Sequence, residues 1–331
     1  MDTTTTYLGL KLPHPFIAGA SPLADTVESA RKVEDAGAAA IVMRSLFEEQ
    51  IDTEALATHK AIDNHADSYA EARSMFVEPL EFVIGPDEYL DHMRRVKAAV
   101  KIPVIASLNG YSTGGWLEYA RSIESAGADE LELNVYYMPT EERETGEEIE
   151  ARTIAMISDM KRQLRIPIAV KLSPFYTALP NFARKLEAAG ADGLVLFNRF
   201  FESDIDIEEL AVISQMHLST SSELLLRLRW LAILSGRLHT ANLAVSGGVH
   251  TSVDAIKAVM AGASAIQMVA ALLKSGPGYL QTVKREMIAW MEENGYESMD
   301  QMRGSMNILR SPNPREYGRV NYMKILQTWH V

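Results

Sequence analysis

A single lysine interrupts an apolar segment in the middle of the chain. Lys171 lies within Ile168–Ser173, which the alternation of apolar and polar side chains predicts to be a buried strand. A buried lysine is rarely retained unless a counter-charge or an anionic ligand satisfies it. On the preceding predicted strand, the same alternation places Glu132 where it could pair with Lys171. A ligand-facing cation and an internal ion pair both remain open, and we favour the ligand because buried ion pairs stabilise folds only weakly.

Further polar side chains follow this alternation on other predicted strands. Ser107, Asn109, Asn134, Asn198 and Ser246 fall on the same face as Lys171. Each asparagine could make only a local hydrogen bond. Together, the three asparagines predict a wall of hydrogen-bonding groups at one end of the fold.

Two consecutive glycines form a second candidate site. Gly247 and Gly248 follow an apolar segment and precede Thr251, whose hydroxyl can cap a helix. Backbone N–H groups at such a turn, with the positive end of the helix, bind anions without a cationic side chain. The alternative is a tight turn that requires the conformational freedom of glycine. We expect a phosphate group at this turn.

A repeated phrase indicates the elements that must position these residues. Ala-Gly-Ala occurs at residues 36–38, 126–128, 189–191 and 261–263, and a short apolar segment follows each copy. The phrase predicts the end of a helix, with glycine in the left-handed conformation, and then a buried strand. The Ile-Pro pairs in Lys101–Val104 and Arg165–Ile168 predict the same transition from helix to strand.

Eight strands that alternate with helices predict a closed (β/α)8 TIM barrel, with residues 1–331 as a single domain. The predicted strands are Phe16–Ser21, Ala40–Ser45, Val104–Asn109, Glu130–Tyr136, Ile168–Ser173, Gly193–Arg199, Leu243–Gly248 and Ala265–Leu272. The predicted helices include Trp116–Ala126, Glu147–Leu164, Leu179–Ala189 and Ser252–Ala261. A hairpin is expected over Thr4–Leu12, ahead of the first strand.

Two insertions and a tail lie outside this repeat. Phe47–Pro86 follows the second strand, and Phe200–Ser222 follows the sixth. Long insertions after the carboxyl ends of barrel strands commonly build the site or a lid. The tail covers residues 295–331, and its segment Asn313–Arg319 could serve as a docking element.

Composition excludes several functional classes. The formal charge of −12 disfavours nucleic-acid binding. The chain has no cysteine, so thiolate catalysis, disulfides and cysteine-held iron–sulfur clusters within this polypeptide are excluded. No apolar stretch approaches the ~20 residues that span a bilayer. The first residues also lack the pattern of a signal peptide, so we expect a cytoplasmic protein.

Motifs across nearly the whole chain resemble the dihydroorotate dehydrogenase family. They are Pro15–Ser21, Arg44-Ser45, Pro103–Leu108, Glu132–Asn134, Val170–Pro174, Asn198, Ser246–Val249 and Ala261–Ala263. The resemblance implies a barrel that binds FMN noncovalently and moves a hydride between flavin N5 and a small substrate of the CH-CH class, such as a pyrimidine. It also leads us to expect a homodimer.

The resemblance further implies roles for individual residues. Ala20 and Ser21 would touch the flavin ring, and Lys171 would stabilise the negative charge of the reduced ring. Gly247 and Gly248, with the backbone of Val269 and Ala270, would hold the phosphate. The full set of expected cofactor-binding residues is Ala20, Ser21, Arg44, Ser45, Asn109, Asn134, Lys171, Asn198, Ser246, Gly247, Gly248, Val269 and Ala270. Lys171 and Tyr137 are the expected catalytic residues, and no metal is expected.

The chain departs from the family pattern at three places. Arg44 replaces a lysine, and Val269-Ala270 replaces Gly-Thr at the phosphate. In the loop after the fourth strand, Tyr137 stands where the family has its catalytic cysteine. A tyrosine with an ordinary pKa near 10 could act as a base only if its pKa were strongly perturbed. The alternative for Tyr136 and Tyr137 is aromatic packing, and we expect dihydroorotate to be a poor substrate.

Other functions remain open. Ser112 or Thr113 could supply a different hydroxyl for true dihydroorotate oxidation. A barrel lyase without flavin would use Lys171 as a Schiff base. A flavin subunit could pass electrons to a separate iron–sulfur partner. His59 and His65 lack the spacing of metal ligands.

Overall fold

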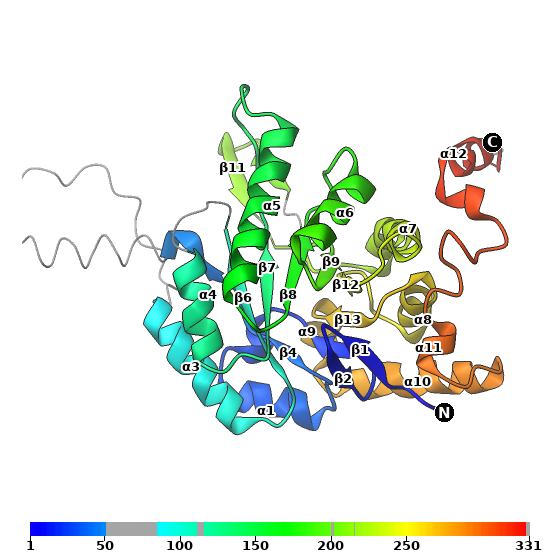
Figure 1. Ribbon diagram of the computed structural model, residues 1–331. Helices are drawn as coiled ribbons and strands as arrows, with labels where there is room; N and C mark the ends of the chain where they lie inside the picture. Colours follow the sequence, from blue (N-terminus) through cyan, green and yellow to red (C-terminus); the bar gives the residue numbers. More distant parts are fainter. Residues whose placement is uncertain (51–84, 111–115, 200–201, 215, 329–331) are drawn as a thin grey trace, which may run out of the picture.

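The centre of the molecule is a closed barrel of parallel strands. The computed structural model describes residues 1–50, 85–110, 116–199, 202–214 and 216–328 (Figure 1). The strand order is β4-β3-β13-β12-β9-β8-β7-β6-β5, and an additional pairing of β4 with β6 closes the sheet. Because β4 (Ile41–Val42) and β5 (Leu46–Phe47) both pair with β6, they share one of eight positions. The predicted (β/α)8 barrel is confirmed.

Helices surround this barrel on its outer face. The other barrel strands are β3 (Phe16–Ala18), β6 (Val104–Asn109), β7 (Glu130–Asn134), β8 (Ile168–Leu172), β9 (Gly193–Leu196), β12 (Asn242–Ser246) and β13 (Ala265–Met268). The described helices are α1 (Val27–Asp35), α3 (Pro86–Ala99), α4 (Trp116–Ser125), α5 (Gly146–Gln163), α6 (Leu179–Ala189), α7 (Leu224–Ser235), α8 (Ser252–Ala261), α9 (Ala270–Ser275), α10 (Tyr279–Glu293), α11 (Met299–Met302) and α12 (Arg319–Thr328). Every helix among the described residues is too short or too polar to span a bilayer.

Several predicted strands are too long at their carboxyl ends. The prediction of a strand over Ala265–Leu272 is wrong beyond Met268, because α9 begins at Ala270. Likewise, β4 ends at Val42 and β9 ends at Leu196. An apolar segment that continues past a strand cannot be distinguished by periodicity from buried turn or helix. The predicted segments Val104–Asn109, Leu179–Ala189 and Ser252–Ala261 coincide with β6, α6 and α8.

The Ala-Gly-Ala repeats end helices as predicted. Their glycines, Gly37, Gly127, Gly190 and Gly262, have φ of 80°, 95°, 104° and 128°. A glutamate precedes the first three glycines by three positions, and its carboxylate accepts backbone N–H groups just before a neighbouring strand. Glu34 accepts from Lys101 and Ile102, Glu124 from Arg165 and Ile166, and Glu187 from His239, Thr240 and Ala241. Each of these three repeats therefore ties a helix end to the start of an adjacent strand.

A hairpin closes the amino end of the barrel. It consists of β1 (Thr5–Tyr7) and β2 (Leu10–Leu12), as predicted. The Leu8 N–H donates to Asn242 Oδ1 at 2.8 Å, and the hairpin's apolar side chains pack against the barrel interior. That interior layer contains Ile17, Ala39, Ala40, Val42, Ile105, Ala169, Val195, Ala244 and Ala265. Inward polar groups can therefore meet a ligand only at the carboxyl ends of the strands.

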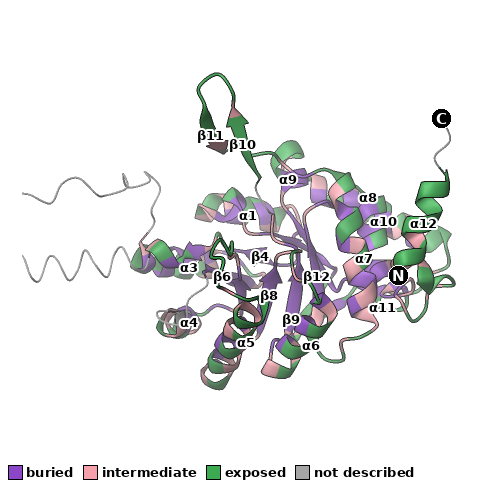
Figure 2. Ribbon diagram, turned by 90° about the horizontal axis from the view of Figure 1, so that it is seen from above, coloured by how far each residue is buried: buried purple, intermediate pink, exposed green. Residues whose placement is uncertain are grey.

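Two described segments stand away from the barrel. The hairpin of β10 (Ser203–Asp206) and β11 (Ala211–Ser214) lies in the insertion after the sixth strand, and it is mostly exposed (Figure 2). The tail passes through the short helix η3 (Pro314–Tyr317) and ends in the exposed helix α12. Most of the first insertion, residues 51–84, falls outside the described residues.

Candidate functional site

Lys171 belongs to a buried network that joins three barrel strands. Its Nζ lies 3.1 Å from Glu132 Oε1 and 3.2 Å from Gln267 Oε1. Gln267 Nε2 in turn donates to Glu132 Oε2. The three residues are 5%, 1% and 1% exposed in the order Lys171, Glu132, Gln267. The ion pair considered from the sequence is therefore present, and Gln267, which alternation along β13 would have turned inward, completes it.

Three site residues lie side by side at the carboxyl ends of adjacent strands. Asn109 of β6 is in register with Asn134 of β7, and Asn134 is in register with Lys171 of β8. Asn134 is 6% exposed, and its Oδ1 accepts no hydrogen bond from the described residues. A buried acceptor left unsatisfied costs about 1–3 kcal/mol. The carbonyl of Asn134 is therefore suited to a ligand that brings an N–H group.

Glu130 lies deeper in the barrel than this row, two residues before Glu132. It is fully buried, and neither carboxylate oxygen accepts a hydrogen bond from the described residues. Burial, together with the negative charges of Asp129, Glu132 and Asp192, raises the pKa of Glu130 to about 9. The side chain is therefore protonated at neutral pH. Glu130 was not among the residues selected from the sequence.

The polar residues of the first two barrel positions are held by the nearby backbone and by the adjacent strand β6. Ser21 donates to the Gly19 carbonyl at 2.9 Å and accepts from the Leu23 N–H, while Ala20 beside it is partly buried. Ser45 and Ser107 share a hydroxyl hydrogen bond of 2.7 Å. These contacts fix the backbone and hydroxyls at the rim of the barrel.

Arg44 is held at the surface by a partner that the sequence analysis missed. Its Nε and Nη2 donate to Asp25 Oδ1 and Oδ2 at 3.0 and 2.5 Å. The Arg44 side chain is 49% exposed. This two-point geometry orients the guanidinium, because the planar fork matches a carboxylate.

The glycine pair is closely packed, so a side chain at Gly248 would meet backbone and one at Gly247 would displace Arg227. Gly247 and Gly248 have φ of 82° and 81°. A Cβ atom on Gly247 would lie 2.9 Å from Arg227 Nη2, and one on Gly248 would lie 2.5 Å from the Leu224 backbone nitrogen. Arg227 is 6% exposed, and its Nε donates to the Ser246 carbonyl at 2.5 Å. A buried cation therefore supports a turn that the sequence analysis described from its backbone alone.

Further polar groups gather around this turn. Ser219 Oγ accepts from the Gly248 N–H at 3.4 Å and lies 3.2 Å from His250 Nε2. Lys274, on the helix that begins at Ala270 after Val269, donates to the Ser219 carbonyl at 3.1 Å. Burial and the positive charge of Lys274 are the main causes that lower the pKa of His250. Two cations, Arg227 and Lys274, therefore lie at the turn, whereas the His250 and Thr251 N–H groups already donate to Asp254 Oδ2 at 3.0 Å.

Asn198 occupies the corresponding position after β9. Its backbone N–H donates to the Leu172 carbonyl at 2.8 Å, which holds the chain beside β8 as it leaves the barrel. Next to it, both Oε atoms of Glu223 accept from Arg199 Nη1, at 2.7 and 2.8 Å. Arg199 and Glu223 were not among the residues selected from the sequence.

Tyr137 is engaged in a cluster within the loop after β7. Its hydroxyl donates to Glu144 Oε2 at 2.6 Å, and Arg152 Nη2 lies 2.6 Å from Glu144 Oε1. The Arg152 guanidinium also lies 5.0 Å from the centre of the Tyr137 ring. The hydrogen bond to Glu144 is the main cause that raises the pKa of Tyr137. A base at neutral pH would need the opposite shift.

Four residues considered from the sequence cannot be placed. Ser112, Thr113, His59 and His65 lie outside the described residues. Within the described residues, no three His, Asp or Glu side chains gather as metal ligands do.

Comparison with known proteins agrees with the motifs. A family model described as dihydroorotate dehydrogenase matches residues 3–291. The catalytic subunit of dihydroorotate dehydrogenase B (NAD(+)) from Thermoplasma volcanium is 26% identical, over 92% of this chain and 98% of its own. The NAD-dependent dihydropyrimidine dehydrogenase subunit PreA from Escherichia coli is 24% identical, over 92% and 77%. Dihydropyrimidine dehydrogenase (NADP(+)) from Arabidopsis thaliana is 21% identical, over 92% and 76%.

Proposed function

The chain belongs to the dihydroorotate dehydrogenase family, and we propose that it is an FMN-dependent oxidoreductase acting on a small, pyrimidine-like substrate of the CH-CH class. Relatives named as dihydroorotate and dihydropyrimidine dehydrogenases support a pyrimidine-like substrate. The observation that carries the flavin assignment is the unsatisfied, buried Oδ1 of Asn134 beside Lys171. FMN would supply the hydride acceptor or donor at its ring.

The ring end of the site fits a flavin. An isoalloxazine ring offers an N–H group. That group could donate to Asn134 Oδ1, which accepts no hydrogen bond from the described residues. It also gains negative charge on reduction, and Lys171 is a cation that Glu132 and Gln267 already hold in place. A preorganised charge of this kind stabilises the reduced form without rearrangement. Ala20, Ser21, Arg44, Ser45, Asn109 and Asn198 are proposed to line the remainder of the ring and its side chain.

The glycine turn fits the phosphate. Consecutive glycines with positive φ can present their backbone N–H groups to an anion. Ser246, Gly247 and Gly248 would hold the phosphate with the backbone of Val269 and Ala270, and the phosphate would replace Ser219 Oγ as the acceptor of the Gly248 N–H. Arg227 would add positive charge from behind the turn. Backbone contacts of this kind tolerate the loss of the family's threonine.

The substrate side differs from the family at the catalytic position. The Tyr137 hydroxyl donates a hydrogen bond to Glu144 and keeps its proton, and its ring lies against Arg152, so its oxygen is a poor proton acceptor. We therefore assign Tyr137 to the wall of the substrate pocket, with Tyr136 beside it. Oxidation of dihydroorotate, which requires removal of a C5 proton, should be slow.

The alternative functions have less support. A Schiff-base lyase would need a free Lys171 amine, yet Lys171 Nζ is held by Glu132 Oε1 at 3.1 Å and Gln267 Oε1 at 3.2 Å. Electron transfer to a separate iron–sulfur protein remains a proposal, since this chain has no cysteine to hold a cluster. A cytoplasmic homodimer remains the expected form of the enzyme.

The absorption spectrum of the purified chain tests the flavin assignment. We expect flavin bands, and release of about one FMN per chain on denaturation. A colourless protein that also fails to bind added FMN would contradict the proposal.

A further inference from the structure

The last described helix lies beyond the residues that the family model matches. The family model ends at residue 291, whereas α12 covers Arg319–Thr328. No residue of α12 is buried, although half of its ten residues are large and apolar. Isolated helices of this length are marginal in water, and apolar packing usually supplies their stability. The outer face of α12 therefore lacks the partner that such a helix needs among the described residues.

That outer face has a regular composition. Arg319, Tyr322, Met323 and Leu326 follow the spacing i, i+3, i+4, i+7, so they share one side of the helix. Tyr322, Met323 and Leu326 are 64%, 54% and 60% exposed. Arg319 makes no ion pair with any described residue. We call this set the α12 face.

The opposite side of α12 is anchored to its own chain. Asn321 and Ile325 line a hollow shared with Leu225 and Leu228 of α7. Tyr317, at the end of η3, donates its hydroxyl hydrogen to the Met306 carbonyl. This hydrogen bond fixes the chain just before α12 begins at Arg319. Because α12 is held beside α7, its outer face is turned away from the rest of the chain and is open to another molecule.

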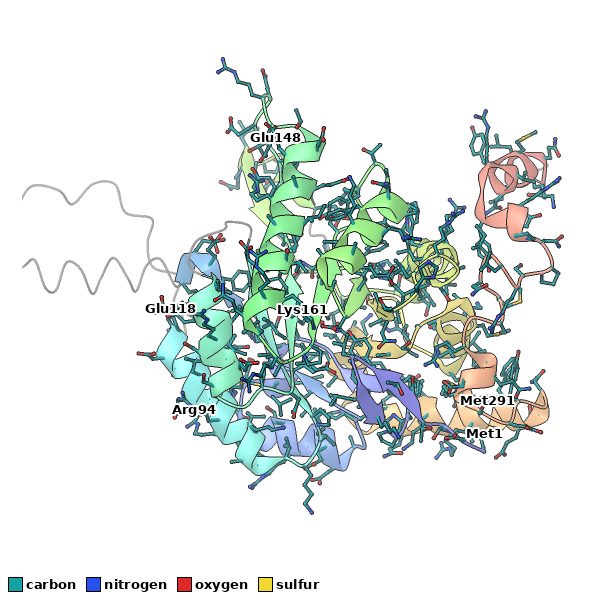
Figure 3. All side chains as sticks on the ribbon, viewed as in Figure 1. Met1, Arg94, Glu118, Glu148, Lys161 and Met291 are labelled. Carbon is teal, nitrogen blue, oxygen red and sulfur yellow. The ribbon has the colours of Figure 1, made fainter. Side chains whose placement is uncertain are left out.

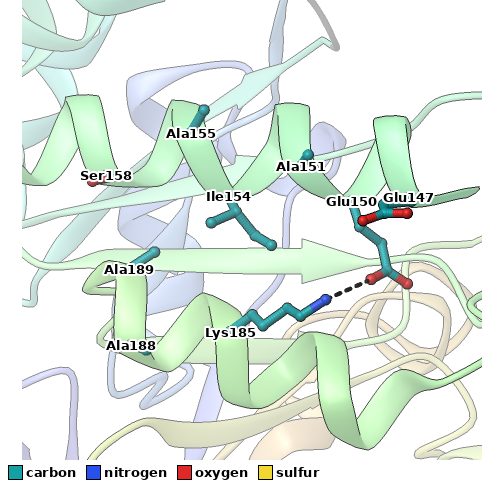
Figure 4. Close-up of a pocket in the computed structure, with 9 residues that line it drawn as sticks. All are labelled: Glu147, Glu150, Ala151, Ile154, Ala155, Ser158, Lys185, Ala188 and Ala189. Carbon is teal, nitrogen blue, oxygen red and sulfur yellow. Dashed lines mark ion pairs between the residues drawn. The ribbon is translucent and has the colours of Figure 1, made fainter.

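A groove between α5 and α6 has the complementary form. It has a volume of about 560 Å³. Its floor is made of small residues and one isoleucine (Figure 4): Ala151, Ile154, Ala155, Ser158, Ala188 and Ala189. Glu147 and Glu150 stand at one end, where Glu150 lies 3.8 Å from Lys185. The groove residues of α5 span about 17 Å, close to the ~15 Å length of α12.

The charges of the two surfaces, the α12 face and the α5–α6 groove, are also complementary. Residues 141–152, at the start of α5, contain six glutamates and two arginines, and Glu148 marks this acidic end of the helix in Figure 3. Residues 303–328 contain five arginines and lysines and one glutamate, in a chain of net charge −12. Opposite potentials of this kind guide association and fix its orientation.

We propose that the α12 face docks in the α5–α6 groove of a second copy of this chain, with Arg319 directed to the glutamates at its acidic end. If the exchange is reciprocal, the two helices close a two-fold dimer. The inference concerns an interface and does not depend on flavin binding.

Sedimentation of the full chain and of charge-reversed variants tests this interface. Arg319→Glu and Glu147→Lys should each weaken self-association about tenfold, because a two-fold dimer contains the pair twice. The double variant should recover much of the affinity. Leu326→Asp should give a monomer, and Arg310→Glu, a tail cation outside α12, should have little effect. Circular dichroism would verify that each variant remains folded.

Several outcomes would overturn the proposal. One is a wild-type chain that stays monomeric at the highest soluble concentration in low salt. A second is a dimer that Arg319→Glu weakens but Glu147→Lys does not, which would direct α12 to another surface. A third is a double variant that is no better than either single variant, since only direct pairing predicts recovery.

Discussion

Lys171 and Glu132 form an ion pair inside the barrel, with Nζ 3.1 Å from Oε1. The two residues come from adjacent strands, and Gln267 contacts both from across the interior. The pair therefore serves the fold and, if the site binds flavin, also presents a cation to the ring. The two roles can be separated, because only one member of the pair carries positive charge.

Lys171→Ala should lower the flavin reduction potential by at least about 30 mV, equal to ~1.4 kcal/mol for two electrons. It should also destabilise the fold by about 3–5 kcal/mol, because Glu132 would be left buried without its counter-charge. Glu132→Gln is the matched variant, since it breaks the pair but keeps the cation. Its potential should stay constant or rise. If both variants lose stability and neither changes the potential, Lys171 has only a structural role.

Much of the fold could be predicted because its signals are local. Gly37 and its three equivalents need a positive φ, and Leu131 and Leu133 alternate with polar neighbours, so helix ends and strand faces are visible in short windows. The strand ends could not be predicted as well. Where Val269 leaves the sheet, the apolar segment simply continues into α9.

The residues missed at the site are those set by long-range packing. Arg227 reaches the glycine turn from a helix twenty residues earlier, and nothing in its own segment indicates that contact. Gln267 lies within the predicted strand Ala265–Leu272, where alternation turns it inward but does not show that it meets Lys171 and Glu132. Alternation does turn Glu130 inward, but its depth follows from the hairpin that closes the barrel beneath it.

Gly247→Asp should lower FMN affinity at least about tenfold, because its Cβ would lie 2.9 Å from Arg227 Nη2, where the carboxylate would displace or neutralise the cation that supports the phosphate turn. The loss of FMN affinity is measured as the flavin content of the purified variant. Gly127→Asp is the control, since Gly127 also has a positive φ of 95° but no atom within 4 Å of the place where its Cβ would lie. Equal flavin loss in both variants would indicate backbone strain, and full flavin in Gly247→Asp would exclude a phosphate at this turn.

Dihydroorotate should reduce the bound flavin slowly at pH 7, and Tyr137→Phe should change that rate little. The hydrogen bond to Glu144 raises the pKa of Tyr137, so the phenol keeps its proton at neutral pH. A general base contributes about 10²–10⁴-fold to a rate, so removing one would slow flavin reduction by a factor that is easily measured. Rapid mixing, followed at the visible flavin band, gives the measurement. Fast reduction in the wild type that disappears in Tyr137→Phe would identify the tyrosine as the base after all.

Glu130→Gln should stabilise the protein, and the gain should increase with pH. The pKa of Glu130 is raised from an ordinary 4.5 to about 9 in the fold, so between these values the folded chain holds a proton that the unfolded chain releases. Stability of the wild type therefore falls as pH rises through this window, by up to about 1.4 kcal/mol per pH unit. Glutamine is uncharged and similar in shape, so it removes this dependence.

Urea unfolding at pH 6 and pH 8 measures the effect of Glu130. The gain from Glu130→Gln should be larger at pH 8 by on the order of 2 kcal/mol. Glu141→Gln, at an exposed glutamate, is the control and should show no such difference. A gain that is the same at both pH values would mean that Glu130 is already ionised in the fold. A buried carboxylate in that state would need a donor or a cation beside it, and the floor of the barrel would then contain a bound ion or water.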